Sequence, residues 1–177
     1  MRFSAAINVS SPPHTWVRVC PDARPLAWKT ARMALVHGIA AMGLVPPRRA
    51  EVGITLADDA FQRLLNERYR GRATSTNVLA FPAWVPSAPL PLGAPLLLGD
   101  VVLAFETVAF EARDQGKAFA DHFRHLVVHG VLHLLGWDHE SEDEAAKMEV
   151  LETAILTNLG VPNPYHGQTV NRSRSCL

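Results

Sequence analysis

The chain has 177 residues, which is enough for one domain with a substantial hydrophobic core. Hydrophobic residues make up 48% of the chain, but no apolar run approaches the roughly 20 residues of a membrane span, so we expect no membrane partner. The 17 basic and 17 acidic residues cancel, which excludes attraction to nucleic acid through overall charge. No early apolar stretch has the length of an export signal, and Cys20 and Cys176 lack ligand-like spacing, so we expect a cytoplasmic protein with free thiols.

The N-terminal part is predicted to contain a leader, a strand and a helix. Residues 1–14 are polar and contain prolines, so we expect a flexible leader. The alternation of apolar and polar residues over 15–19 predicts a short strand. Helical apolar spacing predicts a helix over 26–42 that ends at Gly43.

The next part is predicted to alternate strands and a helix. Residues 52–56 form an apolar run that predicts a strand. Asp58 or Asp59 can cap a helix over 60–69, because a short acidic side chain accepts hydrogen bonds from the first backbone N–H groups. Residues 76–81 favour a third strand.

A proline-rich segment separates the third predicted strand from the fourth. Residues 82–95 contain five prolines, which exclude regular structure and predict a stiff surface loop. This loop either borders a groove or simply connects two strands. Residues 96–104 predict the fourth strand, and residues 106–115 a helix that ends at Gly116.

The C-terminal part is predicted to contain the central helix of the fold. Residues 119–135 have helical spacing and become apolar on almost every side, which indicates a buried helix. Ser141 and Glu144 form a capping-box pattern that begins another helix, which runs to Leu159. We expect residues 163–177 to be a disordered tail.

Taken together, these elements predict the fold class. Four short strands and about five helices, without repeats or a second core, favour an α+β fold. We expect a single compact domain over residues 15–162, with the buried helix at its centre.

The sequence HGVLHLLGWDH, from His129 to His139, carries the main functional pattern. His129 and His133 are four residues apart, so their imidazoles project from one helix face about one turn apart. Gly136 follows where the helix can end in a left-handed turn, and this turn can return His139 to the same point. Three imidazoles suit a zinc ion with an open fourth position, which is typical of a catalytic site. Nickel or copper would also accept them.

The spacing His-x-x-x-His-x-x-Gly-x-x-His is that of the metzincin zinc proteases. Those enzymes carry a Glu directly after the first His as a general base, but Gly130 occupies this position here. The pattern therefore indicates a metal site without the base of an ordinary protease. Zinc held by three imidazoles lowers the pKa of its water from about 15.7 to near 7, so a strong protein base is not required.

Two neighbours of the three histidines are candidates for supporting roles. Asp138 directly precedes His139 and either orients an imidazole or shapes the turn. His125 lies one turn before His129 on the same face, where it could replace a ligand or relay protons. Because His125, His129 and His133 span two turns, we place His125 outside the metal's ligands.

The histidine motif, together with YRGRATSTNVLAFP (Tyr69 to Pro82) and LGD (Leu98 to Asp100), resembles the YbeY family of bacterial endoribonucleases and ribosomal RNA maturation factors. The likeness covers residues 51–159. It implies a small mixed sheet surrounded by helices. It also implies a zinc-dependent endoribonuclease that acts on single-stranded ribosomal RNA, at the 3′ end of the small-subunit RNA, and in ribosome quality control. The partners implied are the small ribosomal subunit and RNA, with no role for DNA.

The resemblance also selects an arginine. A phosphodiester needs its developing negative charge matched, and a guanidinium can do so with two parallel hydrogen bonds. Arg70 matches the arginine of the family motif YRGKD and is our candidate catalytic residue. Ala73 and Ser75 replace the acid and the proline that the family has in this loop. Three more arginines of the same segment are candidates for RNA binding: Arg63, Arg68 and Arg72.

Two other functions are compatible with the motif. In a non-catalytic ribosome assembly factor, zinc would only brace the end of the helix, and a fourth protein ligand would favour this function. In a metalloprotease, the general base would come from elsewhere in the chain.

Overall fold

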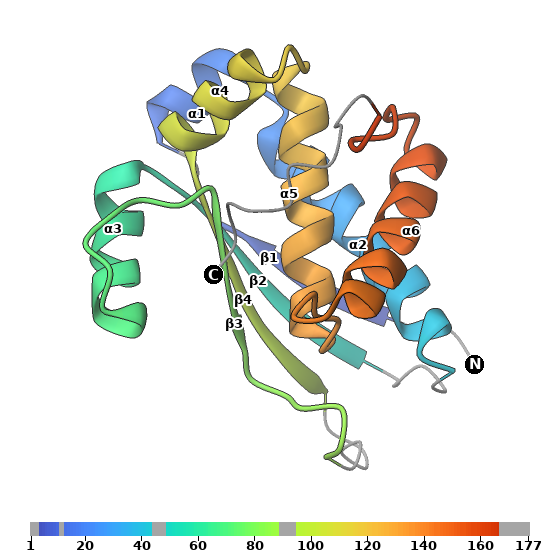
Figure 1. The fold of residues 1–177 in the computed structure, drawn as a ribbon. Helices are drawn as coiled ribbons and strands as arrows, with labels where there is room; N and C mark the ends of the chain where they lie inside the picture. Colours follow the sequence, from blue (N-terminus) through green and yellow to red (C-terminus); the bar gives the residue numbers. More distant parts are fainter. Residues whose placement is uncertain (1–3, 11–12, 44–48, 89–94, 167–177) are drawn as a thin grey trace.

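The computed structural model describes residues 4–10, 13–43, 49–88 and 95–166. These residues form four strands and six helices (Figure 1). In chain order they are β1 (Ser4–Val9), α1 (His14–Val19), α2 (Ala23–Ala41), β2 (Arg49–Ala57), α3 (Asp59–Arg70), β3 (Val78–Pro82), β4 (Leu96–Ala104), α4 (Phe105–Asp114), α5 (Phe119–Leu134) and α6 (Glu142–Asn158). The predicted α+β class is confirmed.

The four strands form one mixed sheet in the order β1-β2-β4-β3. β1 pairs with β2 and β2 with β4 in parallel, whereas β3 pairs with β4 in the antiparallel direction. The mixed sheet implied by the family resemblance is therefore present. β3 lies at the sheet edge nearest the C-terminal part of α5, and it contacts this helix directly.

A bulge in β4 explains the glycine of the LGD sequence. The pairing of β2 with β4 shifts by one residue, so that Glu51 faces Leu97 and Val52 faces Gly99. Gly99 has φ +122°, and a Cβ there would lie 2.1 Å from the carbonyl oxygen of Phe81. Only glycine fits this close approach of two strands, and after the bulge Val101 and Leu103 of β4 are again fully buried.

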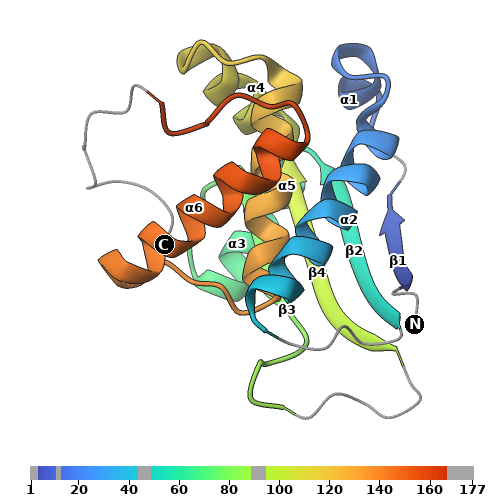
Figure 2. The same ribbon diagram turned by 90° about the vertical axis from the view of Figure 1, so that its right-hand side faces the viewer.

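The helices cover both faces of the sheet, and α5 is the most deeply buried of them. α2 and α5 pack on each other and on the sheet, α6 packs against both, and α3 lies on the opposite face (Figures 1 and 2). Along α5, Val127, Val128 and Val131 have no exposed surface, which confirms the predicted buried central helix. None of the helices in the described segments is long and apolar enough to cross a membrane.

Two predictions for the N-terminal part are wrong. Residues Ser4–Val9 form β1, although we expected them to belong to a loose leader. They pair with β2 through backbone hydrogen bonds at the edge of the sheet, and only Ile7 of this strand is buried. Residues 15–19, expected to be a strand, belong to α1. This helix buries Trp16 completely, and the indole N–H donates to the carbonyl of Ala57 at 2.8 Å. Burial of one large ring therefore outweighs an alternation of only five residues.

The helix starts that we predicted from capping residues are confirmed. The Asp58 carboxylate accepts a hydrogen bond from the backbone N–H of Phe61 at 2.8 Å and begins α3. Ser141 and Glu144 form the expected capping box of α6. Within the predicted tail, residues 163–166 follow α6 in a turn, and residues 167–177 lie outside the described residues.

Candidate metal centre

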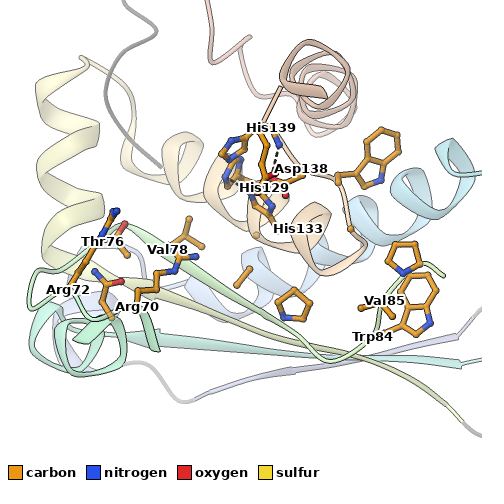
Figure 3. Close-up of a pocket in the computed structure, with 18 of the residues that line it drawn as sticks. Arg70, Arg72, Thr76, Val78, Trp84, Val85, His129, His133, Asp138 and His139 are labelled. Carbon is orange, nitrogen blue, oxygen red and sulfur yellow. Dashed lines mark hydrogen bonds between the residues drawn. The ribbon is translucent and has the colours of Figure 1, made fainter. Parts of the chain in front are cut away.

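The structure brings the three histidines of the motif together. His129 and His133 project from the last turns of α5, and His139 lies in the connection to α6 (Figure 3). One ring nitrogen from each histidine can be chosen so that the three lie within 4.8 Å of one another. The Nε2 atoms of His129 and His133 are 3.1 Å apart.

The turn after α5 has the conformation that the sequence predicts. Gly136 adopts φ +84°, and the chain then returns toward the helix end with His139. A Cβ at Gly136 would lie 2.4 Å from Cγ of Pro86, which belongs to the proline-rich segment. Gly136 is therefore required both by its backbone conformation and by the closeness of the neighbouring loop.

Burial keeps the His133 imidazole neutral near neutral pH. It lowers the pKa of His133 to about 4, and the nearby imidazoles of His129 and His139 add to this effect by opposing a further positive charge. A metal ligand must be a neutral imidazole with a free lone pair, so this environment favours the binding-competent form at neutral pH.

A buried glutamate, which the sequence analysis did not identify, lies behind the histidines. Glu152 of α6 has no exposed surface, and one carboxylate oxygen accepts a hydrogen bond from Nδ1 of His129 at 2.8 Å. The other oxygen contacts Nε2 of His125 at 3.2 Å and accepts a hydrogen bond from the Tyr165 hydroxyl. Burial alone would raise the pKa of Glu152, but the hydrogen bonds from His125 and His129 outweigh it and lower this pKa well below its usual range. In the sequence, this role is indicated by the position of Glu152 among the buried apolar residues of α6, where an acid is unusual.

The two supporting candidates occupy different positions. His125 lies outside the group of three and contacts Glu152 and the hydroxyl of Tyr165. Its pKa is lowered by burial, although the Glu152 carboxylate opposes this shift. Asp138 accepts a hydrogen bond from the backbone N–H of His139 at 2.8 Å, which is a turn-shaping contact.

A cavity of about 1120 Å³ opens in front of the histidines. Its polar end contains Arg70 and Arg72, and its apolar end contains Trp84 and Val85 from the proline-rich segment (Figure 3). The described part of that segment thus borders a groove, whereas residues 89–94 lie outside the described residues.

The four candidate arginines divide into two pairs. Arg70 and Arg72 line the cavity, at the end of α3 and just after it. Arg63 and Arg68 are exposed on the same helix but do not line the cavity. The guanidinium of Arg68 lies 5.7 Å from the centre of the Tyr69 ring instead. The structure therefore separates two arginines that face the histidines' cavity from two that do not.

The donor set fits zinc. Zinc binds imidazole nitrogens at about 2.0–2.1 Å and accepts three histidines with a fourth position left for water or substrate. In the described residues, the group of close potential ligand atoms has three members, all of them histidines. One of these, His129, donates its other ring N–H to a carboxylate, as metal-binding histidines generally do.

Comparisons with known proteins agree on a family. The sequence model described as "Endoribonuclease YbeY" matches residues 27–160. The chain belongs to the YbeY family. A relative named endoribonuclease YbeY from Paramagnetospirillum magneticum is 50% identical over 169 residues, which cover 95% of this chain and 100% of the relative. Another of that name from Rhodopseudomonas palustris is 46% identical over 159 residues, which cover 89% and 92%.

A solved structure supports the fold. The solution structure of a protein from Thermotoga maritima superposes with a TM-score of 0.51 and 18% identity, and the alignment covers 97% of this chain and 99% of that one. At this level of identity, the likeness shows a shared fold.

The loop in which this YbeY chain departs from the family motif YRGKD is anchored at several points. The side-chain amide of Asn66 donates to the carbonyl of Thr74 at 2.8 Å, and the hydroxyls of Ser75 and Thr107 lie 3.2 Å apart. Asn77 donates to the Glu111 carboxylate at 3.0 Å. These contacts tie the loop to α3 and α4, so the cavity wall is held in place with Ser75 in the motif's proline position.

Gly130 has a packing role in this YbeY chain. A Cβ at this position would lie 2.6 Å from Cγ1 of Val101 on β4. The helix therefore approaches the sheet too closely for the glutamate that metzincins carry after their first histidine. This contact does not favour the protease alternative.

Proposed function

We propose that this chain is a zinc-dependent endoribonuclease that cleaves single-stranded ribosomal RNA in the cytoplasm. The observation that carries the proposal is the convergence of His129, His133 and His139 beside a cavity that also contains Arg70 and Arg72. The name shared by the curated relatives, endoribonuclease YbeY, supports the same activity.

The residues of the cavity have separate tasks in this proposal. The three imidazoles would hold zinc, which supplies Lewis acidity for attack on a phosphodiester near neutral pH. The guanidinium of Arg70 binds a non-bridging phosphate oxygen and stabilises the charge that develops there during the reaction. Arg72 binds a neighbouring phosphate and orients the strand.

The shape of the cavity favours a single strand as substrate. The cavity is also lined by Trp137 and by the exposed side chain of Val85, which offer apolar surface to unstacked bases, whereas its arginine end attracts the backbone. Single-stranded RNA can bend so that one phosphate faces the histidines, and a stiff duplex cannot do so as readily. We further propose that the substrate is the 3′ region of the small-subunit ribosomal RNA, that the chain acts on the small ribosomal subunit in quality control, and that DNA is not a substrate.

The test compares RNA cleavage by the zinc-loaded protein with cleavage by His139→Ala. His139 lies in a connecting loop, so its removal should leave the fold intact. His14→Ala is the matched control, because His14 is exposed on α1 and far in sequence from the motif. We expect His139→Ala to lose zinc binding and cleavage, and His14→Ala to retain both.

The outcomes discriminate between the candidate functions. Equal cleavage by wild type and His139→Ala would reveal a contaminating nuclease and refute the proposal. Zinc binding without cleavage, also in the presence of small ribosomal subunits, would favour the assembly factor. Analysis of the product ends would identify the nucleophile, because attack by the RNA's own 2′-hydroxyl leaves a cyclic phosphate and attack by water does not.

A further inference from the structure

Glu152 is a fully buried acid with three side-chain partners. Its carboxylate has no exposed surface and contacts side chains from two other parts of the chain, namely His125 and His129 of α5 and Tyr165 after α6. A buried carboxylate destabilises a fold unless it is fully paired. Apolar residues of similar volume can often replace a buried ion pair without loss of stability, so the presence of an acid here calls for a chemical reason.

The contact with His129 determines which nitrogen of this ring carries the proton. Nδ1 lies 2.8 Å from the Glu152 carboxylate, which is acceptor only, so Nδ1 carries the hydrogen. In the neutral ring, the lone pair is then on Nε2. This atom lies 3.1 Å from Nε2 of His133, on the side where the group of three converges.

We propose that Glu152 is a positioning residue that holds His129 in the Nδ1–H form and directs its Nε2 lone pair toward the metal, and that Tyr165 holds Glu152 in turn. This inference rests on the proposed metal site. It extends that site to the segment after α6, because the Tyr165 hydroxyl shares a carboxylate oxygen of Glu152 with His125. Glu152 itself does not belong to the group of close ligand atoms.

The same helix provides an internal control. His122, one turn before His125, contacts the Glu111 carboxylate through Nε2 at 2.8 Å, and its ring is almost fully buried. This second histidine–glutamate pair has a comparable contact distance, but His122 does not belong to the metal group. Loss of charge at Glu111, whose side chain is 26% exposed, should therefore perturb a histidine–glutamate pair on the same helix without reaching the metal.

The experiment measures zinc affinity by competition with a chromophoric chelator for wild type, Glu152→Gln, Tyr165→Phe and Glu111→Gln. Glutamine keeps the size of the side chain, so the fold should survive, and thermal unfolding of the metal-free proteins checks this. We expect Glu152→Gln to weaken zinc binding about 10- to 100-fold, Tyr165→Phe to weaken it less, and Glu111→Gln to leave it unchanged.

A second readout needs no metal. Nitrogen-15 NMR of the imidazole rings in the metal-free protein at pH 8 reports which nitrogen carries the proton. We expect the Nδ1–H form of His129 in wild type and a shift toward the Nε2–H form in Glu152→Gln.

The outcomes separate this inference from the proposed function. Absence of zinc binding by the wild type would refute the metal site and the inference with it. Zinc binding by the wild type and by Glu152→Gln with equal affinity and the same His129 form would overturn the inference alone. An equal loss of affinity in Glu111→Gln would also overturn it, because the effect would then reflect general destabilisation.

Discussion

Gly130 provides the sharpest test of how the fold positions the histidines of the candidate metal centre. This residue lies on α5 between His129 and His133, and its backbone faces β3 and β4. A Cβ added there would lie 2.6 Å from Cγ1 and 3.1 Å from Cγ2 of Val101, and 3.3 Å from Cγ2 of Val78. Val101 has no exposed surface and, as a β-branched residue, little freedom to move away. The substitution Gly130→Ala must therefore push α5 away from the sheet.

The expected magnitude follows from two opposing effects. Alanine in a helix interior is favoured over glycine by about 1 kcal/mol, which would stabilise the variant in the absence of contacts. Overpacking of a filled core destabilises by about 1–3 kcal/mol. Because the nearest contact is well below a normal carbon–carbon distance, we expect overpacking to dominate and the free energy of unfolding to fall by about 1–2 kcal/mol. Zinc affinity should fall as well, because His129 and His133 move with α5 relative to His139.

A double-mutant cycle with Val101→Ala isolates the contact. Val101→Ala removes the two methyl groups nearest to the new Cβ and leaves only the Val78 contact at 3.3 Å, so the double variant should be more stable than the sum of the single effects by about 1 kcal/mol or more. The assay is urea unfolding of chelator-treated protein, with zinc affinity measured in parallel. Stabilisation by Gly130→Ala, or additivity of the two substitutions, would refute the close approach of α5 to β4.

Three further predictions concern charge, capping and the arginines. Because burial lowers the pKa of His133 to about 4, whereas an unfolded imidazole titrates near 6.5, only the unfolded state takes up this proton between these pH values. The metal-free protein should thus lose about 2 kcal/mol of stability as the pH falls from 6.5 to 4, after allowance for partial exposure of the ring. Urea unfolding at several pH values measures this loss. The same dependence of the free energy of unfolding on pH in His133→Ala would contradict the prediction. Ser141→Ala removes the cap of α6 and should lower the free energy of unfolding by about 1 kcal/mol, so an unchanged urea midpoint would argue against the capping box. Arg70→Ala should lower kcat/KM for RNA cleavage about 100-fold, whereas Arg63→Ala should leave it unchanged because Arg63 lies outside the cavity. Equal effects of the two substitutions would point to nonspecific attraction of RNA.

The parts of the fold that were predictable from sequence are those set by neighbours along the chain. The cap at Asp58, the capping box at Ser141 and the left-handed turn at Gly136 each depend on a few consecutive residues, and all three are confirmed. The convergence of the histidines also follows from local spacing on one helix and the turn after it.

The missed features depend on contacts between distant segments. Glu152 is 23 residues away from His129 in the chain, and no spacing rule links an acid on one helix to a histidine on another. Trp16 donates to Ala57, 41 residues further on, and this burial decides between helix and strand for its segment. The edge strand β1 likewise exists because β2 offers it hydrogen-bonding groups.

The contact between Gly136 and Pro86 couples two parts of the protein that could otherwise vary separately. Pro86 occupies the space that a side chain at residue 136 would fill, and Gly136 belongs to the turn that carries His139. A longer or differently shaped proline-rich segment would therefore press on this turn and displace the third histidine. Engineering of the groove for a broader range of RNA sequences would have to begin at the polar end, since changes at the proline end would also displace a proposed metal ligand.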